Sequence, residues 1–311
     1  MNFAFVFPGQ GSQKIGMFGD YNLPSIIKMT FDEASEVAGK NLLDLTKEGP
    51  LDELNKTVNT QMVMLASGVG FYRYWREQGG AQPTVLAGHS LGEYAALVSG
   101  GALTYGNAAK LVHERATLMQ EAVPEGVGAI AAIIGLPGEE VEQFCLQASD
   151  TTNIVQPANY NSPTQTVVAG NKPAVELAIK LMSENGAKKA IMLPMSVPSH
   201  CALLSSMLDK FEDSLSKVNI KEPSIPILQN ASINAEAAPE VIKKNLLYQV
   251  VKPVFWTKTI EKMTREYKVL KIVEIGPSKV LTGLNKRINK TLEAFAFDQI
   301  SSLPETISKL G

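Results

Sequence analysis

Short runs of consecutive apolar residues alternate along the chain with longer segments in which apolar residues recur every three or four positions. The nearly continuous runs are typical of strands buried on both faces of a parallel sheet, and the spaced segments are typical of helices. Strands of this kind are predicted at 2–7, 84–87, 225–229 and 269–275. Helices are predicted within 23–78, at 93–99, 105–122, 202–218, 239–250 and 254–266, and after 277. This alternation predicts an α/β domain with a parallel sheet.

The middle of the chain follows a different order of elements. Strands are predicted at 128–135, 153–159, 165–169 and 189–195, and helices at 138–148 and 173–185. Their order, β-α-β-β-α-β, is the ferredoxin-like pattern. Prolines and glycines bound this segment at 124–126 and at 194–198. We therefore expect a small ferredoxin-like domain at 125–197, inserted into a larger α/β domain formed by 1–124 and 198–311.

The composition excludes several classes of protein. The 311 residues include 29 basic and 31 acidic side chains, a net charge of −2, whereas sequence-independent nucleic-acid binding needs a basic surface. The N-terminal apolar run has no basic leader and stops at Pro8, and no apolar stretch is long enough to span a membrane. Cys145 and Cys201 are too few for a disulfide framework, which favours a reducing compartment. We expect a cytoplasmic protein that binds neither nucleic acid nor membrane, and a monomer, because no apolar surface stripe stands out.

The strongest chemical signal is the pentapeptide GHSLG at 88–92. It matches the G-x-S-x-G nucleophile elbow, and it lies after a predicted strand and before a predicted helix, as that motif requires. The sharp turn would expose the Ser90 hydroxyl above the sheet, and the main-chain amide of Leu91 would point into the site. The alternative is a glycine-rich turn with a surface serine, but the context favours a nucleophile.

A serine nucleophile needs a base, and the chain has only three histidines. His89 adjoins Ser90, and neighbouring side chains in such a turn point apart, so we expect it to pack beneath the elbow. His113 falls in a predicted helix, where an ordinary surface or groove position is expected. His200 follows the serine along the chain, in a loop before a helix, and is the predicted base by elimination. No aspartate stands out to orient it, so a backbone carbonyl is an alternative acceptor.

The glycine-rich loop at 9–11 raises the question of phosphate binding, because it follows a predicted strand. It matches neither nucleotide fingerprint, since the sixth position of a G-x-G-x-x-G pattern is Lys14 and no G-K-[ST] follows. The loop can still offer backbone donors to a ligand. The three histidines are widely spaced and neither cysteine belongs to a C-x-x-C pair, so no metal site is predicted.

Four motifs carry a resemblance to a known family. They are FPGQGSQ at 7–13, GHSLGE at 88–93, VPSH at 197–200 and VEIGP at 273–277. In these motifs, and over essentially its whole length, the chain resembles bacterial malonyl-CoA:acyl carrier protein transacylases. The resemblance implies an acyltransferase that transfers the malonyl group from malonyl-CoA to acyl carrier protein for fatty acid biosynthesis, without a cofactor. It also implies an α/β-hydrolase-like core with a ferredoxin-like insert.

The resemblance implies a role for each matching residue. Ser90 would carry the malonyl group as an ester, and His200 would act as general base and then as general acid. The backbone amides of Gln10 and Leu91 would form the oxyanion hole.

Two further residues are implied by the same resemblance. Arg115 would hold the free malonyl carboxylate, since a guanidinium can donate two parallel hydrogen bonds to a carboxylate. Without the resemblance, Arg115 would be interpreted as a solvated helix residue beside Glu114. The main-chain carbonyl of Gln249 would orient the histidine, which would explain why no aspartate stands out.

Carrier proteins of such systems are acidic, so a local basic patch is expected despite the net charge of −2. The candidates for docking are, first, Lys188 and Lys189 and, second, Lys286, Arg287 and Lys290. The alternative for both groups is that these side chains are simply solvated.

Three other functions remain open at this stage. A hydrolase that releases acyl groups from carrier protein would use the same Ser90 and His200, but a buried Arg115 would not suit neutral acyl chains. A non-catalytic docking subunit would not need this intact set of residues. A free-standing acyltransferase of a polyketide synthase would share both the chemistry and the pocket.

Overall fold

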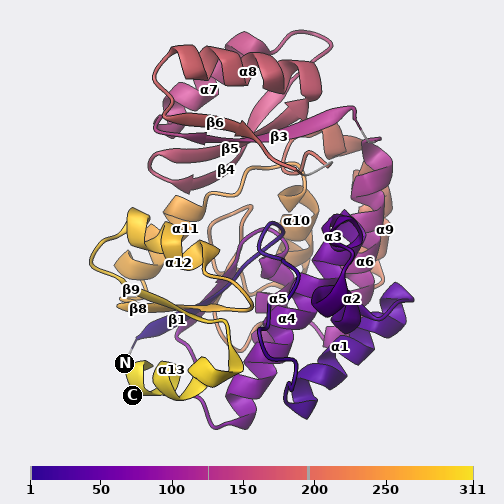
Figure 1. The fold of residues 1–311 in the computed structure, drawn as a ribbon, viewed down its shortest axis with the longest axis vertical. Coiled ribbons are helices and arrows are strands. Elements are labelled where there is room, and N and C mark those ends of the chain that lie inside the picture. The colour runs from indigo at the N-terminus through magenta and orange to yellow at the C-terminus, as the bar shows by residue number, and fades with distance from the viewer. Residues whose placement is uncertain (1, 125, 195–196, 311) are drawn as a thin grey trace.

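The parallel sheet that the apolar runs predict is present, and it has five strands in the order β7-β2-β1-β8-β9. Figure 1 labels β1, β8 and β9 of this sheet. The computed structural model describes residues 2–124, 126–194 and 197–310. The strands are β1 (Phe3–Phe7), β2 (Val85–Gly88), β7 (Ile227–Leu228), β8 (Lys271–Ile275) and β9 (Glu293–Phe297). All neighbouring pairs are parallel, so the carboxyl ends of the five strands meet at one edge of the sheet.

Helices cover both faces of this sheet, as alternation along β1 shows. Phe3, Phe5 and Phe7 point into a large apolar core beneath α4 (Thr57–Glu77), whereas Ala4 and Val6 point into a second core beneath α11 (Trp256–Arg265) and α12 (Val280–Ile288). A strand that is buried on both faces must be apolar at every position, which is why β1 is a continuous apolar run.

The longest helix of this part, α4, is buried along most of its length between α1, α5 and α6. The other helices are α1 (Ser25–Ala38), α2 (Leu42–Glu48), α3 (Leu51–Asn55), α5 (Gly92–Ser99), α6 (Tyr105–Ala122), α9 (Leu208–Ser216), α10 (Pro239–Gln249) and α13 (Leu303–Leu310), with 3-10 turns at Ala202–Met207 and Ile300–Ser302. Within the described ranges, no helix is both long enough and apolar enough to cross a membrane.

A separate antiparallel sheet is formed by the middle of the chain (Figure 1). Its strands are β3 (Gly128–Ile134), β4 (Val155–Ser162), β5 (Gln165–Asn171) and β6 (Lys189–Met192), in the order β4-β5-β3-β6. Two helices, α7 (Gly138–Ala148) and α8 (Lys172–Glu184), cover one face, where Ala131 and Ile133 of β3 pack. Ile130 and Ala132 alternate to the other face, which is turned toward the parallel sheet.

Most predicted elements are confirmed, and the bounds of α6 and α7 match the predictions at 105–122 and 138–148. The helix predicted at 202–218 begins as a 3-10 turn and becomes α-helical only at Leu208. The strand predicted at 225–229 is reduced to β7, because Pro226 has no N–H to donate and suits only the edge of a sheet.

Some predictions miss elements or fall partly outside the described residues. The predicted strand at 189–195 ends at Met192, and its last residue, 195, lies outside the described residues, as does 125, the predicted start of the small domain. β9 and α13 were not predicted. β9 is a half-exposed edge strand with a broken apolar pattern, which explains the omission.

Candidate active site

The carboxyl ends of three adjacent strands carry the central residues of the candidate site. Gln10 follows β1, Ser90 follows β2 and Asn230 follows β7. Loops converge at this edge of an open parallel sheet, which is where such sheets bind ligands. A cavity of about 560 Å³ lies there, and Ile130 and Val167 of the antiparallel sheet line its opposite wall. The site therefore lies between the two sheets.

Ser90 occupies the sharp turn that the elbow motif predicts. Its φ of +51° is in the left-handed region that residues other than glycine rarely adopt. The turn packs tightly on β1, since a Cβ on Gly92 would lie 2.0 Å from the carbonyl oxygen of Phe7. The Asn230 side chain stabilises the turn with two hydrogen bonds. Its Oδ1 accepts from the Ser90 amide at 2.7 Å, and its Nδ2 donates to the Gly88 carbonyl at 2.7 Å. The Ser90 backbone is thus fixed from both sides.

His200 lies against Ser90, with 2.7 Å between Nε2 and Oγ. Its Nδ1 is 2.7 Å from the main-chain oxygen of Gln249 and 3.2 Å from that of Lys252. Carbonyl oxygens can only accept, so Nδ1 carries the proton and Nε2 is free to accept one from the serine. The His200 amide also donates to the Val250 carbonyl at 3.0 Å, which fixes the loop. A neutral base therefore faces the hydroxyl.

The end of α10 supplies the acceptor for which the sequence shows no aspartate. Gln249 is the last residue of this helix, and the last carbonyls of a helix have no partner within it. One of them is therefore available to the imidazole. The negative end of the helix dipole also favours the imidazolium that forms when His200 accepts a proton.

His200 is a neutral base because it is buried. Burial, with a smaller contribution from the charge of Arg115, lowers the pKa of His200 to about 3, against the opposing effect of the Gln249 carbonyl. The imidazole is consequently unprotonated at neutral pH, the state that a general base requires.

Arg115 is buried beside the serine, with only 1% of its surface exposed, so it is not a solvated helix residue. Its Nη1 donates to Gln61 Oε1 at 2.6 Å, and its Nη2 donates to Gln249 Oε1 at 3.1 Å and to Ser90 Oγ at 3.3 Å. Within the described part of the chain, its Nε has no hydrogen-bond partner and no carboxylate lies within 4.0 Å of it. The guanidinium thus has donor capacity left at the cavity wall.

The main-chain amides of Gln10 and Leu91 are also placed at the nucleophile. Both residues line the cavity, and the loop after β1 lies directly on the elbow, since a Cβ on Gly9 would be 2.5 Å from the His89 carbonyl oxygen. Among the described residues, neither amide donates to another backbone carbonyl. Both can therefore donate to an oxygen atom of a ligand.

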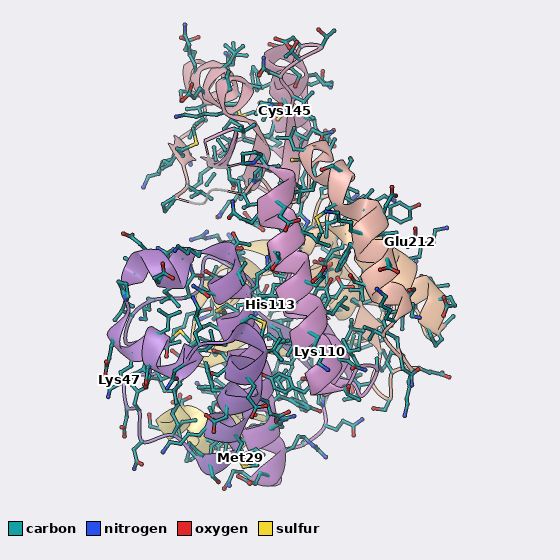
Figure 2. All side chains as sticks on the ribbon, turned by 90° about the vertical axis from the view of Figure 1, so that its right-hand side faces the viewer. Met29, Lys47, Lys110, His113, Cys145 and Glu212 are labelled. Atoms are coloured by element: carbon teal, nitrogen blue, oxygen red, sulfur yellow. The ribbon has the colours of Figure 1, made fainter. Side chains whose placement is uncertain are left out.

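The other two histidines play no part in this pair. His89 Nε2 lies 2.8 Å from Asn161 Oδ1, and its ring packs 5.4 Å from Trp256, which confirms a packing position. Figure 2 shows His113 on α6 near Lys110, at the side of the molecule that faces the viewer. In the described ranges, no three His, Cys, Asp or Glu side chains come together as metal ligands.

Three residues of the site were not predicted from the sequence. Asn230 could have been found, because it directly follows a predicted strand at the edge where loops converge. Glu93 directly follows the GHSLG motif and is fully buried. Gln61 gave no signal, since a polar residue within a long helix is usually exposed; here it is buried and contacts Arg115.

The predicted docking cations lie at one end of the antiparallel sheet. Lys189 begins β6 and is paired with Ile134 of β3, which is paired with Gln165 of β5. Gln165 Oε1 in turn accepts from Arg287 Nη1 at 2.9 Å. The exposed side chains are Lys188, Lys189, Lys286, Arg287 and Lys290. The two groups of cations therefore flank the same rung of the sheet, and Gln165 also lines the cavity.

Comparison with known proteins identifies the family. The family model described as "Acyl transferase domain" matches residues 4–305. A relative from Escherichia coli (strain K12), named malonyl CoA-acyl carrier protein transacylase, is 47% identical over 302 residues, 97% of each chain. This chain belongs to the malonyl CoA-acyl carrier protein transacylase family. The family member of the same name from Bacillus subtilis (strain 168) is 41% identical over 305 residues, which cover 98% of this chain and 94% of the relative.

Solved structures of transacylases share the whole fold. An acyl carrier protein S-malonyltransferase from Vibrio cholerae has a TM-score of 0.94 at 48% identity, with 98% of this chain and 100% of that chain covered. A malonyl-transacylase in complex with a type II PKS acyl-carrier protein has a TM-score of 0.96 at 45% identity, with 99% and 100% covered. The parallel sheet with a separate antiparallel sheet is thus the architecture of transacylases.

Proposed function

We propose that this protein transfers the malonyl group of malonyl-CoA to the phosphopantetheine thiol of acyl carrier protein, through a malonyl ester on Ser90. Membership of the transacylase family supports acyl transfer. The observation that carries the choice of malonyl is Arg115, a buried cation whose Nη2 lies 3.3 Å from Ser90 Oγ. A cation at that position suits an acyl group that ends in a carboxylate.

In the first half-reaction, His200 Nε2 accepts the Ser90 proton while Oγ attacks the thioester carbon. The carbonyl oxygen becomes negative and accepts hydrogen bonds from the amides of Gln10 and Leu91. When this intermediate collapses, the C–S bond breaks, the ester remains on Ser90, and His200 gives its proton to the CoA sulfur.

The second half-reaction repeats these steps with a different thiol. His200 accepts the proton of the phosphopantetheine thiol, the sulfur attacks the ester carbon, and Ser90 leaves with the proton that His200 returns. The reaction is thus ping-pong. It needs no cofactor and no metal, because CoA and phosphopantetheine are parts of the substrates.

Arg115 selects the acyl group in this proposal. The malonyl carboxylate would receive hydrogen bonds from the guanidinium and neutralise a buried charge. A neutral acetyl group would gain neither these hydrogen bonds nor the attraction of the cation, a difference of about 1.5–3 kcal/mol for each charged hydrogen bond. This difference argues against a hydrolase for neutral acyl chains, which would have no use for the cation.

We also propose the finer description of the fold that the resemblance implies. An α/β-hydrolase-like core would comprise 1–124 and 198–311, with a ferredoxin-like domain at 125–197. The element order β3-α7-β4-β5-α8-β6 supports the insert, and the nucleophile elbow between β2 and α5 supports the core.

The carrier protein would dock at the end of the antiparallel sheet, where Lys188 and Lys189 lie near Arg287. We expect the double charge reversal K188E/K189E to slow malonyl transfer to carrier protein and to spare malonylation of Ser90 by malonyl-CoA. Lys110→Glu is the control, since Lys110 is an exposed lysine on α6, far from β6 (Figures 1 and 2). Equal losses in both half-reactions would show that the docking assignment is wrong.

Intact-protein mass spectrometry tests the function itself. We expect the protein mixed with malonyl-CoA to gain one malonyl group, with little labelling by acetyl-CoA, and Ser90→Ala to gain none. Arg115→Ala should reduce the difference between the extent of labelling by malonyl-CoA and the extent of labelling by acetyl-CoA. If the wild type takes up both groups equally or neither, malonyl transfer is the wrong assignment, and a hydrolase becomes the leading candidate.

One second candidate has a specific observation in its favour. The malonyl-transacylase that is solved with a type II PKS acyl-carrier protein is 45% identical to this chain. Malonyl loading for a polyketide synthase would use the same residues. Rates of transfer to fatty acid and polyketide carrier proteins, measured side by side, would separate the two pathways.

A further inference from the structure

Glu93 is a buried carboxylate that the proposed chemistry does not use. It lies in the first turn of α5, and none of its surface is exposed. Its Oε2 accepts two hydrogen bonds, from the Gln249 side-chain amide at 2.7 Å and from the Asn230 main-chain amide at 3.0 Å. Its Oε1 has no hydrogen-bond partner among the described residues. Burial of a carboxylate costs free energy, so an interaction that compensates it is expected.

Those two hydrogen bonds link Glu93 to Ser90, His200 and Arg115. Through Gln249, it reaches Arg115, whose Nη2 donates to Gln249 Oε1, and His200, whose Nδ1 donates to the Gln249 carbonyl. The Gln249 amide also donates to the Ser90 carbonyl at 3.0 Å. Through Asn230, Glu93 reaches the elbow, because that side chain holds the Ser90 amide. One carboxylate therefore fixes the two residues that hold nucleophile, base and guanidinium.

Glu93 is also the carboxylate whose charge acts on Arg115. No carboxylate of the described residues forms a direct ion pair with Arg115, and Gln249 stands between the two, accepting from the cation and donating to the anion. A charge buried as deeply as Arg115 is stable only with compensation nearby. We propose that Glu93 is a positioning residue that supplies the counter-charge of Arg115 while no malonyl group is bound. The inference rests on the proposed function.

This arrangement makes malonyl binding depend on the charge of Glu93. The malonyl carboxylate would be a second anion for one guanidinium, so an ionised Glu93 opposes its binding and a neutral Glu93 does not. The titratable groups facing Glu93 are Arg115 of α6 and Tyr94 of α5, while His200 lies beyond Gln249. Among the described residues, the groups of α10 and of the segment after β7 that donate hydrogen bonds to Glu93 belong to Gln249 and Asn230, which are both neutral.

The titration of Glu93 falls in an accessible range. Burial raises its pKa to about 7, and the hydrogen bonds from Asn230 and Gln249 and the charge of Arg115 limit the shift. Lowering the pH therefore neutralises Glu93 in the folded enzyme. We expect the ratio of the second-order rate constants for Ser90 acylation by malonyl-CoA and by acetyl-CoA to rise as pH falls from about 8.5 to about 6. Both donors carry the same CoA phosphates, so their titration cancels in the ratio.

Glu93→Gln removes the charge and keeps the shape. The glutamine oxygen can accept from Asn230 and Gln249, while its NH₂ takes the place of the unpartnered Oε1. We expect E93Q to raise the malonyl-to-acetyl ratio at pH about 8 by roughly fivefold and to make the ratio independent of pH. A ratio that matches the wild type at every pH would overturn the inference.

Glu274→Gln is the matched control. Glu274 is equally buried, but it accepts from the amide of Thr282 at 2.7 Å and from its hydroxyl at 2.9 Å, at the start of α12. We expect E274Q to lower thermal stability without changing the pH dependence of the ratio. If E93Q does not fold, the pH dependence of the malonyl-to-acetyl ratio in the wild type tests the inference by itself, because a ratio that does not change with pH would overturn it. Failure of the wild type to accept malonyl would instead overturn the proposed function.

Discussion

Ser90 and His200 both hold left-handed backbone conformations, with φ of +51° and +63°. For residues other than glycine, each such conformation costs about 1–3 kcal/mol and persists only where surrounding contacts enforce it. Asn230 enforces the first through the Ser90 amide, and the Val250 carbonyl enforces the second through the His200 amide. The motifs predict Ser90 and His200 as the reactive residues, but they do not show these contacts, because Asn230 lies 140 positions from Ser90.

The lowered pKa of His200 leads to a prediction about pH. Because the imidazole stays neutral well below the ordinary pKa of histidine, the rate of Ser90 acylation by malonyl-CoA should not fall as pH decreases from about 8 to about 5.5. Stopped-flow or quenched acylation over this range measures it. An acid limb with a midpoint near 6.5, the value of an unperturbed histidine, would contradict a buried neutral base.

The same shift affects stability in a definite direction. The unfolded chain binds a proton at His200 below pH of about 6.5, and the folded chain does not, so the contribution of His200 to folding stability falls as pH decreases below that value, while Glu93, whose folded-state pKa is raised to about 7, contributes in the opposite direction. Glu93→Gln removes the opposing contribution, so we expect the free energy of unfolding of E93Q, measured by denaturant titration, to fall more steeply between about pH 7 and about pH 5 than that of the wild type.

The helices and strands around the site can be predicted from local sequence patterns, but the contacts between elements that are distant in sequence cannot. The apolar run of β1, the elbow and the helix α6 could each be predicted, since each depends on residues that are close in sequence. The carbonyl that orients His200 could not be located by patterning, because it depends on α10 ending beside a loop 49 positions earlier in the chain. The resemblance implies Gln249 as the residue that orients His200. In the structure, Gln249 ends α10, so its carbonyl has no partner within the helix and can accept from the imidazole.

The junction between α5 and β1 gives a prediction at this scale. Gly92→Ala would place a Cβ 2.0 Å from the Phe7 carbonyl oxygen, a backbone atom of the central strand that has no room to move. We expect a loss of about 3 kcal/mol or more in the free energy of unfolding, measured by denaturant titration.

Gly106→Ala is the control for that experiment. Gly106 is also near the start of a helix, α6, but a Cβ there meets nothing within 4 Å. The substitution should leave stability unchanged or raise it by up to about 1 kcal/mol, because alanine restricts the unfolded chain. Similar losses in both variants would mean that the close approach of α5 to β1 does not limit position 92.

The molecule as a whole makes the cavity, since neither sheet encloses it alone. The parallel sheet provides the reactive edge, and the antiparallel sheet provides an apolar wall opposite it. On β3, alternate residues serve two purposes: Ala131 and Ile133 pack under α7 and α8, and Ala132 lines the cavity. The sequence predicts this strand and the insert that contains it. It cannot predict that one face of the insert completes the site, because an apolar wall and an apolar core have the same pattern.

Substitution of Ala132 tests that wall. Ala132→Phe would extend a ring from β3 into the cavity, opposite the serine, so the thioester should reach Ser90 less often. We expect the second-order rate constant for acylation by malonyl-CoA to fall by about tenfold or more, with little change in stability, because the ring enters open space and not the packed core. Ile191→Phe is the matched control: Ile191 is paired with Ala132 on the same face of the sheet, but it is 50% exposed and lies outside the cavity. If the two variants acylate at the same rate, the antiparallel sheet does not bound the path of the substrate, and the parallel sheet alone would form the functional site.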